Sequence, residues 1–127
     1  MASSTDALER GREAFAGRFW SDAFEALSIA DGATPLSADD LELLARAAYM
    51  LGRDDDYLGG LERAHHAHLA AGEIARAAGC TFWIGHNLMF RGESGPATGW
   101  FARGQRLLDG GQLDCVERGY LRIPALL

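Results

Sequence analysis

The sequence predicts an all-α fold of about three antiparallel helix pairs followed by a partial seventh helix. Three stretches, 18–30, 52–64 and 92–104, share one frame, with the first two 34 residues apart and the last two 40 apart. Apolar residues recur in them at helical spacing, and glycine or proline stands between them. A frame repeated every 20–50 residues or so is typical of stacked helical repeats. The recurring columns are Ala23, Tyr57, Ala97; Ala26, Gly60, Trp100; Leu27, Leu61, Phe101; and Ala30, Ala64, Gly104.

The first two helix pairs are predicted from apolar spacing and from turn residues. The first pair covers 6–17 and 22–31, where Ser21 or Asp22 can cap the second helix and Pro35 follows its end. The second pair covers 38–51 and 55–71. Its first helix starts after a capping sequence at Ser37, and its two helices are joined by a tight turn at Gly52.

The third pair is predicted over 73–90 and 95–108, with Pro96 tolerated in the first turn. The longer first helix of this pair is expected to absorb the six extra residues of the second interval. A terminal helix is predicted over 114–123, before Pro124. We expect one domain, 1–127, with repeats at 4–37, 38–71 and 78–111. Because the chain ends in an apolar run, we expect a fragment of a longer protein; the alternative is a lid over the last repeat.

Composition restricts the function classes. The net charge is −6, which argues against broad binding of nucleic acid or of anionic membranes. Cys80 and Cys115 are far apart in the sequence, so we expect buried, reduced thiols. The N-terminus has no secretory leader pattern, and no apolar run reaches membrane-spanning length. The sequence therefore predicts a cytoplasmic protein.

The repeat columns resemble those of tetratricopeptide (TPR) proteins. The second-helix pattern is met by Ala23, Leu27, Ala30 and Pro35, by Leu61 and Ala64, and by Ala97 and Phe101. The first-helix pattern is met by Leu44, Ala45 and Ala48 and by Ile84, Gly85 and Leu88. Arg10 departs from the first-helix pattern, and Tyr57 departs from the second-helix pattern. The resemblance implies a right-handed superhelix that presents a surface for protein binding.

Longer phrases are similar to the TPR region of actinobacterial LuxR-type transcriptional regulators. These phrases are 11–16, 61–65, 80–85, 100–108 and 115–121. Such regulators carry a DNA-binding helix-turn-helix, but no basic recognition helix follows the repeats here. The resemblance therefore implies the interaction or sensor part of a bacterial regulator. We expect no enzymatic activity, because the sequence contains none of the common nucleotide-binding or hydrolase motifs.

In TPR proteins the first helix of each repeat lines a concave groove, which implies a set of partner-binding residues. The set is Arg12, Phe15, Glu42, Arg46, Tyr49, Phe82, His86 and Met89. One column reads Arg12, Arg46, His86, and it is predicted to bind an acidic protein or peptide through its carboxylates. Reversing both arginine charges is expected to abolish binding without unfolding. Alternatively, the arginines pair with Glu9, Glu13 or Glu42 on a solvated face.

Other candidate sites receive structural interpretations. His65 and His68 share a helix face and are weak metal candidates, with Glu62 nearby, but zinc needs three or four protein ligands. A solvated helix face is favoured, and no metal or cofactor is expected. The three tryptophans, Trp20, Trp83 and Trp100, are expected in the core. Other function classes are small-ligand sensing and homodimerisation through an apolar end formed by Tyr120, Leu121, Ile123, Leu126 and Leu127.

Overall fold

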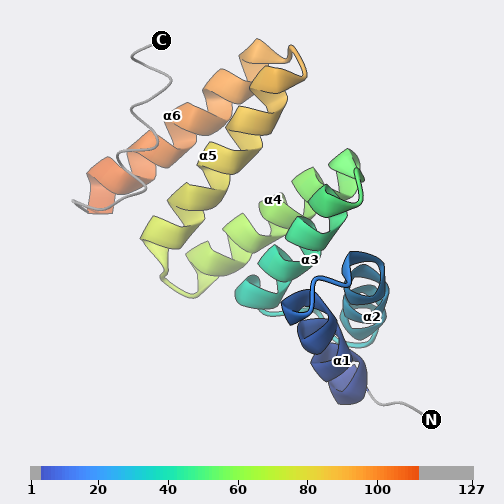
Figure 1. Ribbon diagram of the computed structural model, residues 1–127. Helices are drawn as coiled ribbons and strands as arrows, with labels where there is room; N and C mark the ends of the chain where they lie inside the picture. Colours follow the sequence, from blue (N-terminus) through green and yellow to red (C-terminus); the bar gives the residue numbers. More distant parts are fainter. Residues whose placement is uncertain (1–3, 112–127) are drawn as a thin grey trace. The chain divides into compact units, whose positions relative to one another are not determined.

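A computed structural model describes residues 4–111, and the described chain consists of six α-helices without a strand (Figure 1). This confirms the predicted all-α class. The helices are α1 (Ser4–Ala16), α2 (Trp20–Ala33), α3 (Ala38–Met50), α4 (Asp54–Ala70), α5 (Ile74–Phe90) and α6 (Ser94–Gly111). In this part of the chain, no helix is long and apolar enough to cross a membrane. The predicted helix 114–123, Cys115 and the apolar end lie outside the described residues.

The extra length of the second interval is shared between two helices. We predicted that the fifth helix alone absorbs the six additional residues. It is longer than its counterpart, since α5 has 17 residues and α3 has 13. However, α4 also has 17 residues, against 14 in α2. The predicted third repeat, 78–111, therefore starts one turn inside α5, which begins at Ile74.

The chain divides into two compact units, residues 1–60 and 61–127, and each is described by itself. In the N-terminal unit, α1 packs against α2, and α3 packs against both. Among the glycines of this unit, Gly11 leaves the least room for a side chain, because an added Cβ would lie 2.7 Å from Leu27 Cγ. The buried apolar residues of this unit are mostly small: Ala7, Ala23, Ala26, Leu27, Ala30, Leu36, Leu41, Leu44, Ala45, Ala47, Ala48 and Tyr57.

In the C-terminal unit, α5 packs against α6 along most of its length (Figure 1). Ala78, Phe82 and Leu108 form a buried cluster, and Phe101 packs against it. Gly85 allows close approach, because a Cβ there would lie 2.7 Å from Phe101 Cε1. Gly11 and Leu27 are 16 residues apart, and so are Gly85 and Phe101. The same small-against-large contact therefore occurs in the first and third predicted repeats.

Four short turns use one backbone pattern. After α1, α3, α4 and α5, a residue with positive φ closes the helix: Arg18 (φ 63°), Gly52 (75°), Gly72 (77°) and Gly92 (81°). In each turn the next backbone N–H donates to a carbonyl five residues earlier, as Arg53 does to Ala48 at 2.9 Å. The predicted caps at Ser21 or Asp22 are wrong. Phe19 is the N-cap residue of α2 and makes no side-chain cap hydrogen bond.

Arg18 occupies the position that glycine fills in the other three turns, which leads to a prediction. Because a side chain is strained at positive φ, Arg18→Gly is expected to stabilise the N-terminal unit by about 0.5–1 kcal/mol. Gly52→Ala is expected to destabilise it by about 1 kcal/mol. Urea unfolding followed by circular dichroism measures both changes. A loss of stability in Arg18→Gly would contradict the strain argument.

Candidate interaction surface

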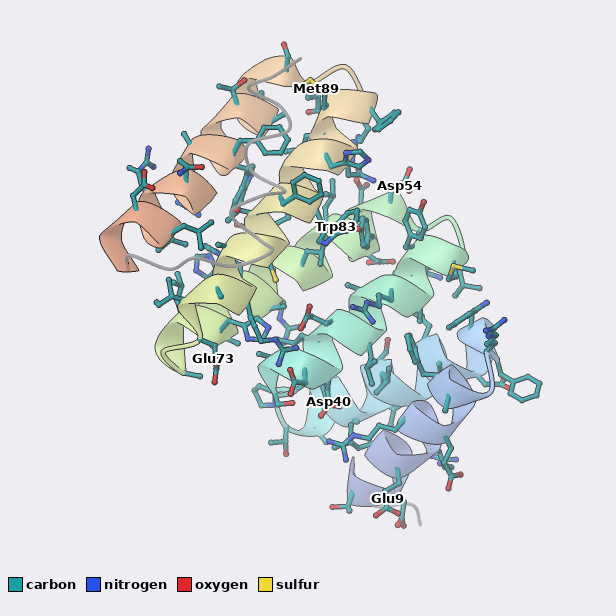
Figure 2. All side chains as sticks on the ribbon, turned by 60° about the vertical axis from the view of Figure 1, so that its left-hand side comes forward. Glu9, Asp40, Asp54, Glu73, Trp83 and Met89 are labelled. Atoms are coloured by element: carbon teal, nitrogen blue, oxygen red, sulfur yellow. The ribbon has the colours of Figure 1, made fainter. Side chains whose placement is uncertain are left out.

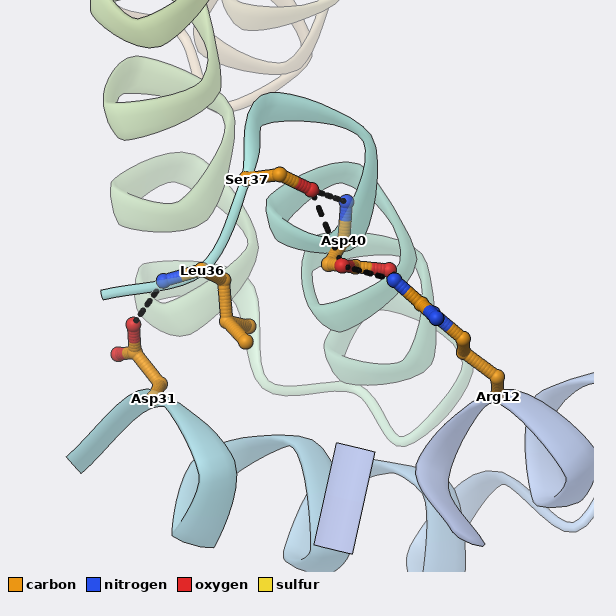
Figure 3. A network of polar contacts seen from close by, with 5 residues as sticks. All are labelled: Arg12, Asp31, Leu36, Ser37 and Asp40. Carbon is orange, nitrogen blue, oxygen red and sulfur yellow. Dashed lines mark hydrogen bonds and ion pairs between the residues drawn. The ribbon is translucent and has the colours of Figure 1, made fainter. Parts of the chain in front are cut away.

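Arg12, a predicted groove residue, is held in an ion pair inside the N-terminal unit (Figure 3). Its Nε donates to Asp40 Oδ1 at 3.0 Å, and its Nη2 donates to Oδ2 at 2.7 Å. The Asp40 side chain is 5% exposed, whereas that of Arg12 is 52% exposed. Arg12 is therefore paired, but the partner that the structure shows is Asp40, which the alternative of a paired arginine did not name.

Asp40 lies in the first turn of α3, and this turn fixes its position. Ser37 caps the helix by accepting the Asp40 backbone N–H at 3.3 Å, as the sequence predicted. The Ser37 hydroxyl in turn donates to Asp40 Oδ2 at 3.0 Å (Figure 3). The hydrogen bonds from Arg12 lower the pKa of Asp40, burial opposes them, and the Ser37 hydroxyl assists. Arg12 thus fastens α1 to the start of α3, and the Nε–Nη2 edge of its guanidinium is occupied by the Asp40 carboxylate.

The remaining predicted groove residues of this unit are partly or well exposed. Tyr49 is 56% exposed, and its ring lies 5.0 Å from that of Tyr57. Arg46 is exposed on the same helix, whereas Glu42 is half-buried. Phe15 is half-buried, and its ring forms an edge-to-face pair with that of Trp20, with ring centroids 5.2 Å apart. The exposed side of α3 thus carries one cation, Arg46, and one aromatic ring, Tyr49.

The C-terminal unit presents a more apolar surface along α5. Trp83 is 44% exposed, Met89 43% and Phe90 80%, and His86 is also exposed. Figure 2 shows Trp83 midway along the helix and Met89 near its end. The His86 ring lies 5.9 Å from Trp83 and 4.8 Å from Phe90. We call Trp83, His86, Met89 and Phe90 the α5 face.

Phe82 and Trp83 occupy positions opposite to those predicted. Phe82, expected in the groove, is 7% exposed and packs in the core with Ala78 and Leu108. The prediction of a core Trp83 is wrong, because nearly half of this side chain is exposed. Neighbouring helical residues point about 100° apart, so a one-residue error in phase exchanges core for surface. The close approach at Gly85 marks the buried stripe as 78, 82 and 85.

The histidine cluster is not a solvated face, and that prediction is wrong. His65 is 0% exposed and His68 is 1% exposed, while His66 is exposed. His65 Nδ1 lies 2.9 Å from the carbonyl oxygen of Ala77, and Glu62 is exposed. Among the described residues, no group of three metal-ligating side chains includes His65. His65 therefore joins α4 to α5 in the C-terminal unit.

The α5 face is the strongest candidate functional site in the described chain. It gathers three large apolar side chains and one imidazole on a single helix, and no acidic residue occurs in α5. Its arrangement suits contact with another macromolecule, because it offers aromatic area without a nucleophile or a ligand set. No protein-family model, curated protein or solved structure matches the chain. The geometry of the α5 face and the sequence are therefore what indicates a function for this chain.

Proposed function

We propose that this chain is a non-catalytic protein-interaction module of the TPR kind, and that it binds a segment of a partner protein along the α5 face. The observation that carries the proposal is the exposure of Trp83, Met89 and Phe90 on one helix. Exposed large apolar side chains that cluster are costly to leave in water and are typical of binding surfaces. Tryptophan is also among the residues that most often dominate binding energy.

The packing of the helix pairs supports the TPR part of the proposal. Gly11 against Leu27 and Gly85 against Phe101 repeat one contact at one spacing. Short turns of similar geometry join the helices within the predicted pairs. The wider role, as the interaction or sensor part of a bacterial transcriptional regulator, is supported by the sequence phrases described above.

We expect the partner segment to bind mainly through apolar side chains and to a smaller extent through acidic groups. The charge of Arg12 is balanced by Asp40, so the column Arg12, Arg46, His86 offers an acidic ligand less positive charge than the sequence predicted. On the α5 face, His86 is the one cation-forming group, and it is flanked by aromatic rings. Rings of this kind provide apolar area and accept the edges of a partner's aromatic side chains.

The proposal predicts that binding depends on Trp83. Peptides selected for binding to the full chain from a displayed library are expected to bind Trp83→Ala about 30-fold more weakly, a loss of about 2 kcal/mol. Ile29→Ala, which removes an equally exposed side chain from α2, is expected to leave the affinity within about twofold. Calorimetric titration measures both.

Unchanged affinity in Trp83→Ala and in Phe90→Ala would contradict the proposed site. Circular dichroism of each variant at the titration temperature shows that the fold is intact. Trp83 also touches the buried Phe82, with ring centroids 4.9 Å apart. Phe90, which is 80% exposed, provides the variant with least effect on packing.

A further inference from the structure

His65 is a buried titratable group that the proposed function does not use. Its side chain lies in the C-terminal unit and is completely excluded from water. Three helices surround it: its own α4, α5 through the carbonyl of Ala77, and α6 through Trp100. The edge of one ring meets the face of the other, with centroids 5.6 Å apart and planes at 84°.

The hydrogen bonds define the protonation state that fits this site. A carbonyl oxygen only accepts, so Nδ1 carries the hydrogen that is donated to Ala77 at 2.9 Å. The neutral ring then has a bare Nε2, which is buried without a hydrogen-bond partner among the described residues. A second proton would place a charged N–H donor at this atom with no acceptor to receive it. Such a group is costly to bury.

The charged groups around the ring do little to offset the cost of burying a protonated imidazole. On α4, His66 disfavours a positive ring and Glu62 favours it weakly. On α6, Arg103 disfavours it, and its guanidinium lies 4.7 Å from the Trp100 ring that His65 touches. From α5 the group that faces His65 is the Ala77 carbonyl, which favours the charged form. Burial outweighs these contributions, so the pKa of His65 lies below its ordinary value.

We propose that His65 is an acid-sensitive latch in the C-terminal unit, which holds α4 against α5 and α6 while it is neutral and releases them when Nε2 is protonated. The folded unit binds the proton less readily than the unfolded chain does. The latch is therefore complete above the ordinary histidine pKa of about 6.5 and weakens as the pH falls below it. The device goes beyond the proposed function, but it acts on the helix that carries the α5 face.

Hydrogen exchange of the full chain at pH 7.5 and pH 5.5 tests the latch. Protection factors, which already correct for the chemistry of exchange, are compared for the amides of α5. In the wild type, acid is expected to lower them by more than twofold, with about tenfold as the upper limit at pH 5.5. His65→Asn retains a donor for the Ala77 carbonyl but cannot titrate, so its protection factors should change less than twofold. His66→Asn, which alters the exposed neighbour, should behave as the wild type does.

Two results would overturn the latch. One is a wild-type protection factor that changes less than twofold, and the other is an equal acid loss in His65→Asn. If His65→Asn does not fold, nuclear magnetic resonance titration of the wild-type His65 ring decides the matter. A ring that remains neutral at Nε2 well below pH 6.5 or so supports the latch, and a ring that titrates at its ordinary value contradicts it.

Discussion

Arg12→Glu is expected to lower the free energy of unfolding of the N-terminal unit by about 1–3 kcal/mol. The variant removes the two guanidinium donors, at 2.7 and 3.0 Å, from the buried carboxylate of Asp40 and places a like charge beside it. The lower end of the range applies if water replaces the guanidinium, since the Arg12 side chain is 52% exposed. Hydrogen exchange of α1 and α3 amides measures the loss within this unit.

The matched control is Arg46→Glu, which reverses an exposed arginine on α3. It is expected to change stability by no more than about 0.5 kcal/mol. The sequence alone predicted that reversing the charges of Arg12 and Arg46 leaves the fold intact. The structure changes this expectation for Arg12 and retains it for Arg46. Equal stability of Arg12→Glu and Arg46→Glu would contradict the structural role of the ion pair.

The pH dependence provides a second check on Arg12. Because the pKa of Asp40 is lowered in the folded unit, the ion pair contributes fully above the unfolded value of about 3.9. Its contribution is lost as the pH falls through the folded pKa. The stability difference between the wild type and Arg12→Glu should therefore be constant near neutral pH and shrink in acid, as the clustered carboxylates of the variant take up protons and the wild-type pair is then lost.

Gly11→Ala is expected to destabilise the N-terminal unit by about 1–3 kcal/mol, although alanine is the better helix former. The new Cβ would lie 2.7 Å from Leu27 Cγ and 3.2 Å from the Leu27 backbone nitrogen. Leu27 is fully buried, so it cannot move aside without disturbing the contact between α1 and α2. Urea unfolding monitored by circular dichroism measures the change.

Gly59→Ala is the control for this substitution. Gly59 lies inside α4, and no atom would lie within 4 Å of its new Cβ. The gain in helix propensity should therefore appear undiminished, as a stabilisation of about 0.5–1 kcal/mol. The two substitutions are chemically identical and are expected to have opposite signs. If Gly11→Ala stabilised the chain as Gly59→Ala does, the close helix contact would be refuted.

The helices were predictable because local signals mark both of their ends. Ser37 caps α3 as expected, and Gly52 takes the positive φ that ends this helix. A capping side chain and a glycine act within a few residues of themselves, so no tertiary information is needed to place them. Arg18 takes the same positive φ after α1 although it is not a glycine. The turn between α1 and α2 was therefore harder to place from the sequence.

The candidate site was less predictable, because exposure depends on helix phase and on distant partners. Met89, His86, Arg46 and Tyr49, which were predicted to line a groove, are all exposed. The partner of Arg12, however, lies 28 residues away in the sequence, and no local spacing identifies it. Trp83 was assigned to the core because it falls at a predicted packing column between helices, although its exposure is what makes it a binding candidate.

The buried histidines show the same limit. Three histidines within four residues, at 65, 66 and 68, favour a solvated helix face, yet His65 and His68 are buried. The burial of His65 follows from the helices that cover it, since Ala77 comes from α5 and Trp100 from α6. An alanine-rich segment such as 75–78 is a local indication that a neighbouring helix approaches closely at that point.

The most direct test of the proposed function is the response of the three tryptophan indole N–H signals to a bound peptide, measured by nuclear magnetic resonance on the full chain. Trp20 reports on the N-terminal unit, Trp83 on the α5 face and Trp100 on the contact with His65. Binding along the α5 face predicts that the Trp83 signal shifts on saturation while the Trp20 signal does not. A bound peptide that shifts Trp20 and leaves Trp83 unchanged would contradict it.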